Sequence, residues 1–320
     1  MPVSVAQDAA FLAHLPGRSH PESPARLRAI AAALEQAALE QAAAGHQGAS
    51  LSLREIPVRE ATREELERVH VPEYLAQLER ADGRAVQLDP DTRTSAGSYR
   101  AALRAAGASI ELATRVAQGD AAPGIALVRP PGHHALRDRA MGFCLFNNIA
   151  IAAEALRARG LAERIAIYDF DVHHGNGTEA IFYDRAEVFF SSTHQYPFYP
   201  GTGAADATGS GKGEGTNLNV PLEAGAGDRE LGEAIDRVIA PRVRAFRPDM
   251  ILLSAGFDAY ERDPLGGLAV TVEGFRAVAR RWRRLAEELC GGRVAAFLEG
   301  GYHLEGLAAS VRAFLEAWSE

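Results

Sequence analysis

The sequence predicts an α/β fold in which a parallel sheet carries helices on both faces. From residue 124 onward, short apolar runs that suit buried strands alternate with longer stretches of helical periodicity, and this alternation is typical of parallel sheets. Acids, histidines and a tyrosine directly follow several of the apolar runs. Because ligands bind outside the carboxyl ends of the strands in such sheets, these polar residues mark the expected ligand-binding edge.

The expected helices are recognised by periodicity and by their start and stop residues. Ser23 and Pro24 suit the first turn of a helix that Gly45 would end, and Gly119 would close the next helix. Pro241 should kink or end the fourth helix, because proline cannot donate a backbone hydrogen bond. The expected helices span 23–44, 98–118, 147–160, 228–247, 271–290 and 304–318.

The expected strands are short and largely apolar. Such runs suit strands that are covered on both faces. They span 124–130, 164–171, 186–194, 249–256 and 293–301. Neither a low-complexity linker nor an internal repeat interrupts 124–318, so we expect residues 1–320 to form a single domain.

Composition and charge argue against several classes of function. The 320 residues are 47% hydrophobic and 24% charged, as in a globular protein with a large core. A net charge of -8 leaves no basic excess for a nucleic-acid partner. No apolar run approaches the ~20 residues that a bilayer span needs. Because the first residues lack signal-peptide features and only Cys144 and Cys290 are cysteines, we expect a cytoplasmic protein.

Polar side chains follow four of the expected strands. In chain order they are the pair His133 and His134, the stretch AIYDFDVHHGNGT at 166–178, Asp258 and Tyr302. Each has an ordinary structural explanation, such as a surface histidine pair, an Asx turn or a turn tyrosine. Positions so far apart in the chain meet only if the sheet forms. Their joint occurrence at strand ends therefore favours one shared site.

The stretch 166–178 has the composition of a metal site. Alternate residues share a face of a strand, so its acids and one imidazole point away from its apolar residues. The two faces consist of Tyr168, Phe170 and Val172, and of Asp169, Asp171 and His173. A divalent cation would remove the penalty of burying the carboxylates. Asp171 and His173 supply two ligands, Asp258 is the best third, and three protein ligands suit a catalytic zinc ion.

Other motifs do not support a different chemistry. The stretch 208–217 is rich in glycine, but Gly213 follows Lys212 where a phosphate loop needs Ser or Thr. Ser254 does not lie in the G-x-S-x-G elbow of a serine hydrolase. Cys144 has apolar neighbours and no adjacent base, so we interpret it as a small buried residue.

Several separated motifs resemble those of the histone deacetylase and acetylpolyamine amidohydrolase family, in particular its class II-like bacterial members. These motifs are RPPGHHA, GFCLFNN, DFDVHHGNGT, FYPGTG, SAGFDAY with DPLGG, and EGGYH. HPESPARL and LERVHVPEYL extend the resemblance over nearly the whole chain. It implies an arginase-like, three-layer α/β fold with a central parallel sheet of about eight strands and helices on both faces.

The resemblance also implies a catalytic role for each matching residue. Two adjacent imidazoles move protons, an acid and an amide orient them, and a tyrosine donates to the developing oxyanion. These residues are His133 and His134, Asp169 and Asn176, and Tyr302. Because Asn176 is neutral, His134 should be the less basic imidazole and should accept the proton of water, whereas His133 beside Asp169 should favour its charged form.

Two ions and a substrate tunnel follow from the same resemblance. Zn²⁺, with Fe²⁺ as an alternative, would be bound by Asp171, His173 and Asp258. A structural K⁺ ion would be held by Asp169 and Ser192 and by backbone groups of Asp171, His173 and Thr193. The tunnel would be lined by Gly142, Phe143, Tyr199, Leu265, Gly300 and Gly301. Tyr199 departs from the phenylalanine that the family often has at this place.

The expected function is zinc-dependent hydrolysis of the amide bond of an acyl-lysine or a similar acylated amine. We expect the protein to have no membrane contact, and it could form a homo-oligomer. An acetylpolyamine is an alternative substrate, but Leu265 stands where polyamine-selective relatives have an acid, unless Glu22 or Glu261 reaches the tunnel mouth. A binuclear manganese ureohydrolase would need a carboxylate where Tyr260 stands. A catalytically silent acyl-lysine binder is disfavoured because all the expected catalytic residues are retained.

Overall fold

In the computed structural model, which describes residues 2–43 and 51–320, eight parallel strands form one sheet. The strand order is β2-β1-β3-β8-β7-β4-β5-β6. The strands are β1 Val3–Ala6, β2 Leu53–Glu55, β3 Gly124–Ala126, β4 Ile165–Asp169, β5 Val188–Gln195, β6 Asn217–Leu222, β7 Met250–Ala255 and β8 Val294–Leu298. The order places β8, β7 and β4 side by side, so the loops that follow these three strands meet at one edge.

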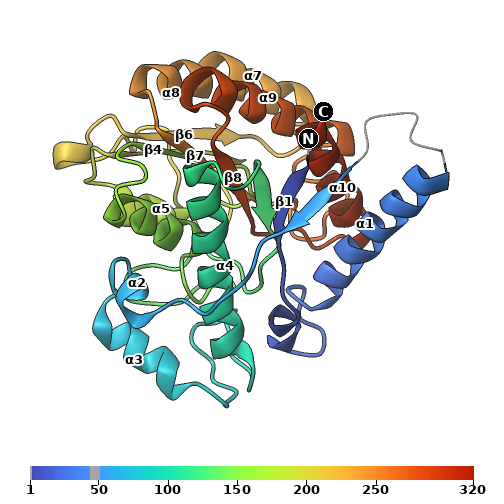
Figure 1. Ribbon diagram of the computed structural model, residues 1–320. Coiled ribbons are helices and arrows are strands. Elements are labelled where there is room, and N and C mark those ends of the chain that lie inside the picture. The colour runs from blue at the N-terminus through green and yellow to red at the C-terminus, as the bar shows by residue number, and fades with distance from the viewer. Residues whose placement is uncertain (1, 44–50) are drawn as a thin grey trace.

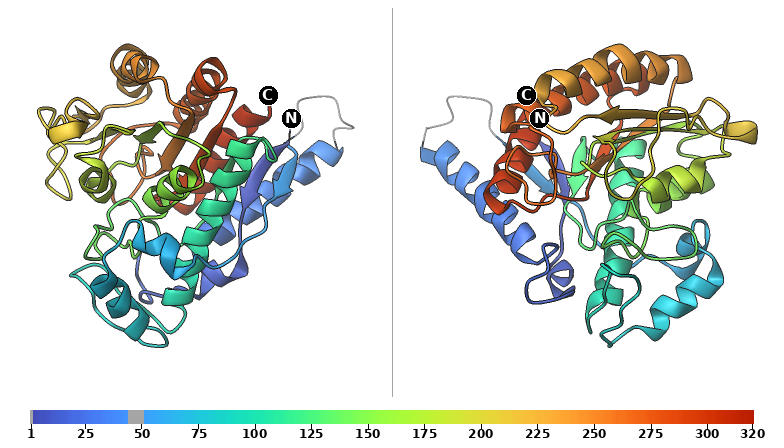
Figure 2. Two further views of the ribbon diagram at one scale, coloured as in Figure 1. Left: turned by 60° about the vertical axis from the view of Figure 1, so that its left-hand side comes forward. Right: turned by 180° about the vertical axis from the view of Figure 1, so that it is seen from behind.

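Helices cover both faces of the sheet, as Figures 1 and 2 show. One face is covered by α1, α7, α8, α9 and α10, and the other by α4, α5 and α6, while α2 and α3 extend the core of this second face beyond the sheet. The helices are α1 Ala25–Ala43, α2 Arg63–Glu67, α3 Pro72–Arg80, α4 Ser98–Gln118, α5 Asn148–Ala158, α6 Asn176–Phe182, α7 Asp228–Glu233, α8 Ala240–Phe246, α9 Val272–Cys290 and α10 Leu304–Ser319. Shorter helical segments are η1 Ala9–Ala13, η2 Gly211–Gly213 and the π-helical η3 Ala234–Ile239.

The central strands alternate between two apolar cores. In β4, Ile165 and Ile167 face α4 and α5, whereas Tyr168 packs on the opposite side, where its ring stacks on Trp282 of α9 with 4.6 Å between centroids. Phe170 and Val172 belong to the same core as Tyr168, as the alternation of the sequence predicts. This arrangement confirms the three-layer prediction and leaves the polar residues of 169–173 at the strand end.

The structure adds short elements that the sequence pattern does not reveal. The strands β1 and β2 have four and three residues, too few for a periodic signal. Pro221 argues against a strand in the sequence pattern, so the sequence alone does not predict β6. The strand tolerates this proline because it lies at the edge of the sheet. The expected strand 124–130 keeps regular pairing only over Gly124–Ala126. The expected end of the first helix at Gly45 lies outside the described residues.

Pro241 does not end the helix expected at 228–247, which instead consists of three consecutive helical segments. The π-helical segment η3 separates α7 from α8, and Pro241 stands in the first turn of α8. A proline removes a backbone donor and clashes with the preceding turn, and a local change to π-helical geometry accommodates both effects. The helix 98–118 is confirmed together with its glycine end, because Gly119 has φ 78°.

Trp282→Ala should strongly destabilise the protein. The indole is fully buried between α9 and the sheet, and truncating such a side chain lowers the free energy of unfolding by about 3–5 kcal/mol. Urea denaturation measures this change. Leu39→Ala is the control, because Leu39 is 66% exposed and its truncation should change the free energy by less than about 0.5 kcal/mol. Equal effects of the two substitutions would contradict this packing.

Candidate metal centre and active site

The loops after β4 and β7 bring the three expected metal ligands together. Donor atoms of Asp171, His173 and Asp258 all lie within 4.8 Å of one another. His173 Nδ1 is 2.9 Å from Asp171 Oδ1 and 3.2 Å from Asp258 Oδ2. Both carboxylates are buried, at 1% and 0% exposure. Two carboxylate oxygens and one imidazole nitrogen form a donor set that suits a zinc ion.

Asp258 shares its counter-charge, the imidazole of His173, with Asp171. Asp258 Oδ1 accepts a hydrogen bond from the backbone N–H of Val172 at 2.8 Å, but among the described residues the buried Oδ2 has no other neighbour to pair with than His173 Nδ1 at 3.2 Å. Burial and the nearby charge of Asp171 raise the pKa of Asp258 to about 7. A bound cation would complete the coordination of Oδ2 and favour the ionised carboxylate, so the residues present fit a divalent metal.

Two glycines make room for this cluster. A Cβ atom at Gly300 would lie 1.9 Å from Asp258 Oδ2, and one at Gly256 would lie 2.1 Å from Asp171 Oδ2. The backbone N–H of Gly300 also donates to Asp171 Oδ2 at 2.8 Å. Glycine is therefore required because the backbone approaches the carboxylates closely.

The adjacent imidazoles have different hydrogen-bond partners. His133 Nδ1 donates to Asp169 Oδ2 at 2.8 Å, and His134 Nδ1 donates to Asn176 Oδ1 at 2.7 Å. Burial disfavours charge on His133, but the carboxylates of Asp169 and Asp171 outweigh it and raise the pKa of His133 well above its ordinary value. Burial and the positive charge of His133 lower the pKa of His134. Only His134 is thus suited to accept a proton near neutral pH.

The residues expected around a potassium ion lie on neighbouring strands. Asp169 pairs in register with Ser192 of β5. The hydroxyl of Ser192 hydrogen-bonds His194, and that of Thr193 hydrogen-bonds Tyr168. Their side-chain oxygens therefore already have partners within the protein.

A cavity of about 170 Å³ leads to the cluster. It is lined by Asp91, Pro131, His133, His134, Gly142, Phe143, His173, Tyr199, Leu265, Gly300 and Tyr302. Of the expected tunnel residues, Gly301 does not line it, since a Cβ there would point at Leu307 and Phe257 of the core. The ring of Tyr199 stands edge-on to His134, with 5.2 Å between centroids.

Two side chains that the motif analysis did not identify hold one wall of this cavity. Gly142 and Phe143 form a tight turn with φ values of 58° and 68°, and the latter is unusual for a residue with a side chain. Asp91 Oδ1 accepts the N–H of Gly142 at 3.1 Å, and Thr92 Oγ1 accepts the N–H of Phe143 at 3.0 Å. These bonds present the Phe143 ring to the cavity.

The loop that carries Tyr302 is held from two sides. Asp263 Oδ2 accepts the backbone N–H groups of Tyr302 at 2.7 Å and of His303 at 3.0 Å. Arg26 donates to the carbonyl oxygen of Gly301 at 2.6 Å, and its guanidinium lies 5.0 Å from the centre of the Tyr302 ring. Asp263 lies in the stretch DPLGG and Arg26 in HPESPARL, but only the structure reveals these contacts.

Glu22, Glu261 and Tyr260, which bear on the alternative functions, lie outside the cavity lining. Glu22 does not reach the tunnel mouth: it is fully buried and forms ion pairs with Arg129 and Arg26, so that suggestion from the sequence is wrong. Glu261 is exposed and does not line the cavity. The hydroxyl of Tyr260 accepts a hydrogen bond from Arg262 at 3.0 Å.

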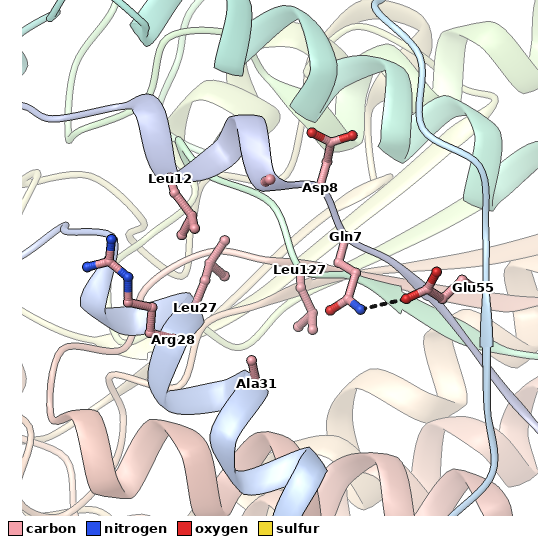
Figure 3. Close-up of a pocket in the computed structure, with 9 residues that line it drawn as sticks. Gln7, Asp8, Leu12, Leu27, Arg28, Ala31, Glu55 and Leu127 are labelled. Atoms are coloured by element: carbon pink, nitrogen blue, oxygen red, sulfur yellow. Dashed lines mark hydrogen bonds between the residues drawn. The ribbon is translucent and has the colours of Figure 1, made fainter.

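A second cavity, of about 340 Å³, lies between α1, η1 and the ends of β1 and β3 (Figure 3). Leu12, Leu27, Ala31 and Leu127 form its apolar wall, and Gln7 donates to Glu55 at its rim. It contains no expected site residue. Among the described helices, none is long and apolar enough to span a bilayer.

Gly300→Ala should abolish metal binding while the protein stays folded. The added methyl group would overlap Asp258 Oδ2 and displace the carboxylates, as direct removal of the ligand in Asp258→Ala would. Elemental analysis of the purified protein measures bound metal per chain. Gly17→Ala is the control, because its nearest neighbour would lie 3.6 Å from the new Cβ. A full complement of metal in Gly300→Ala or Asp258→Ala would argue against this centre.

Comparison with known proteins agrees with this geometry. The family model of the histone deacetylase domain matches residues 20–318 of the sequence. Histone deacetylase 10, chloroplastic, from Oryza sativa subsp. japonica is 44% identical over 313 residues, which cover 93% of this chain and 70% of the relative. Polyamine deacetylase HDAC10 of Mus musculus is 41% identical over 272 residues, which cover 79% of this chain and 39% of the relative.

A solved structure supports the fold as well. The crystal structure of the HDA15 HD domain superposes with a TM-score of 0.89 at 41% identity, and the match covers 99% of this chain and 88% of the other. Both the domain match and the arginase-like arrangement of the sheet extend over nearly the whole chain. The chain therefore belongs to the histone deacetylase family, a family of hydrolytic deacetylases.

Proposed function

We propose that residues 1–320 form one zinc-dependent deacetylase domain, which removes acetyl or related acyl groups from the ε-amine of acyl-lysine or a similar acylated amine. The observation that carries the proposal is the buried cluster of Asp171, His173 and Asp258 at the base of a cavity lined by two imidazoles and Tyr302. Zinc, when bound, polarises the amide carbonyl and lowers the pKa of water to about 7. The two buried free cysteines support a cytoplasmic, reducing location.

In this proposal the protein's own side chains divide the proton transfers. His134 accepts the proton of the attacking water at Nε2, because its Nδ1–H is held by Asn176 and its pKa is low. It then returns the proton to the departing amine nitrogen. His133 stays charged beside Asp169, and the Tyr302 hydroxyl donates to the oxygen that develops negative charge.

We further propose that K⁺ binds beside this centre. Asp169, Asp171, His173, Ser192 and Thr193 would hold it, and the pairing of β4 with β5 supports the assignment. The ion would add positive charge beneath carboxylates that have no contact with solvent.

Tyr302→Phe should lower kcat by about 10²–10³-fold and leave KM nearly unchanged, because the lost hydrogen bond forms only as the oxyanion develops. Turnover of a fluorogenic acetyl-lysine amide measures both constants. Tyr199→Phe is the matched control, since it removes another hydroxyl from the same cavity and should change kcat only slightly. Unchanged turnover of Tyr302→Phe would remove the assigned role, and an inactive wild-type protein would favour a silent acyl-lysine binder.

An acetylpolyamine is the second candidate substrate. The carboxylate of Asp91 lines the cavity, where it could attract the distal ammonium group of such a molecule, and the mouse relative is named a polyamine deacetylase. Leu265, which lines the same cavity, argues for acyl-lysine, because an apolar side chain offers no partner for a second positive charge. We therefore favour acyl-lysine.

The wild-type protein should show a higher kcat/KM for an acetyl-lysine peptide than for acetylputrescine. Leu265→Glu should shift the ratio toward acetylputrescine by at least about tenfold, which corresponds to about 1.4 kcal/mol of charge pairing. Leu265→Gln is the control for shape, because it adds polarity without charge. A wild-type preference for acetylputrescine, or equal shifts in both variants, would overturn this assignment.

A further inference from the structure

We propose that His133, Cys144 and Glu299 form a second metal-binding site, distinct from the Asp–His–Asp cluster, which takes up soft divalent ions and thereby inhibits the enzyme. One ligand atom from each of the three residues lies within 4.8 Å of the other two, and all three residues are buried. Bonds of 2.0–2.3 Å place tetrahedral ligands about 3.3–3.8 Å apart. Small side-chain movements would therefore close these donors around one ion.

Each of the three residues has one atom that could bind an ion. His133 Nδ1 is held by Asp169, which leaves Nε2 as the ligand nitrogen once the charged ring loses its Nε2 proton, and such carboxylate-supported histidines are common at metal sites. Glu299 Oε2 accepts the N–H groups of Gly132 and His133, at 2.6 Å and 3.1 Å. Its Oε1 accepts one hydrogen bond, from Ser254 Oγ at 3.2 Å, and retains a lone pair for an ion.

The thiol of Cys144 determines which metal ions this site prefers. It donates a weak hydrogen bond to the carbonyl oxygen of Gly142 at 3.2 Å. Soft ions such as Cd²⁺ prefer thiolate ligands, whereas the Asp–His–Asp cluster offers oxygen and nitrogen only. On binding, the metal–sulfur bond forms as the S–H bond of Cys144 breaks, and the metal–nitrogen bond forms as the charged imidazole of His133 gives up its Nε2 proton; both protons leave to solvent. A sulfur signal from a bound metal would thus report the second site alone.

The site shares one residue with the cavity. His133 lines the cavity, whereas Cys144 and Glu299 are buried and adjoin the lining residues Phe143 and Gly300 in sequence. An ion that enters the cavity would therefore meet His133 first. Binding would engage His133 Nε2, which lies 3.8 Å from Asp171 Oδ2 beside the first cluster. The inhibitory part of the inference rests on the proposed deacetylase function, whereas the binding part does not.

Titration of zinc-loaded protein with Cd²⁺ tests both parts. Metal content gives the stoichiometry, the ultraviolet charge-transfer absorption of cadmium thiolate reports the sulfur ligand, and hydrolysis of the acetyl-lysine amide gives activity. In the wild-type protein, one Cd²⁺ per chain should produce the absorption band and reduce activity at least about tenfold, and a chelator followed by zinc should restore activity.

Two matched variants make the result specific. Cys144→Ala should bind zinc and turn over substrate but show neither the band nor the inhibition, and Cys144→Ser provides a closer isostere if the alanine variant folds poorly. Cys290→Ala, which removes the other buried thiol, should behave like the wild-type protein.

Absence of the band in the wild-type protein, or its persistence in Cys144→Ala, would overturn the site. A band without loss of activity would overturn the inhibitory role. Inactivity of the zinc-loaded protein before any cadmium is added would instead count against the proposed function, so the two failures can be told apart.

Discussion

The burial of negative charge at the carboxyl edge of the sheet is the constraint on which the rest of this structure depends. Five carboxylates there have essentially no contact with solvent: Glu22, Asp169, Asp171, Asp258 and Glu299. A buried carboxylate is tolerated only when a positive charge or several hydrogen bonds stabilise it. Arg129 pairs with Glu22, and His133 pairs with Asp169. Asp171 and Asp258 share the imidazole of His173, and a divalent cation would balance the charge that remains, so the fold places these carboxylates where a metal would stabilise them.

The same constraint explains the conformation of the surrounding loops. Carboxylates that must point inward need backbone donors close by, and the backbone can approach them only where no side chain intervenes. Gly300 satisfies both needs, because it donates to Asp171 and leaves room for Asp258. Asp263 then fixes the next turn by accepting the N–H of Tyr302. The position of the tyrosine is therefore determined by the loop that completes the metal cluster, which couples the two parts of the site.

Sequence reasoning recovers the features that leave a local signal. The long helix 98–118 and the strand around Ile165–Asp169 are apparent because periodicity and length act within one segment. The candidate metal ligands stand out because acids and imidazoles are unusual directly after buried strands. Contacts between distant segments of common residue types leave no such signal. Asp91 and Thr92, which hold the turn at Phe143 from fifty-one residues away, could be identified only in three dimensions.

The two histidines illustrate how neighbouring groups acquire different chemistry from their partners. His133 and His134 are adjacent in the chain, their ring centroids are 4.0 Å apart, and burial disfavours the charged form of both. The carboxylate of Asp169 reverses that tendency for one ring, while the neutral amide of Asn176 cannot reverse it for the other. A second carboxylate in place of Asn176 would favour charge on His134 as well, whereas an amide in place of Asp169 would favour a neutral His133 and remove the positive charge beside Asp171. One acid and one amide give a site that contains a proton acceptor and keeps its buried charges balanced.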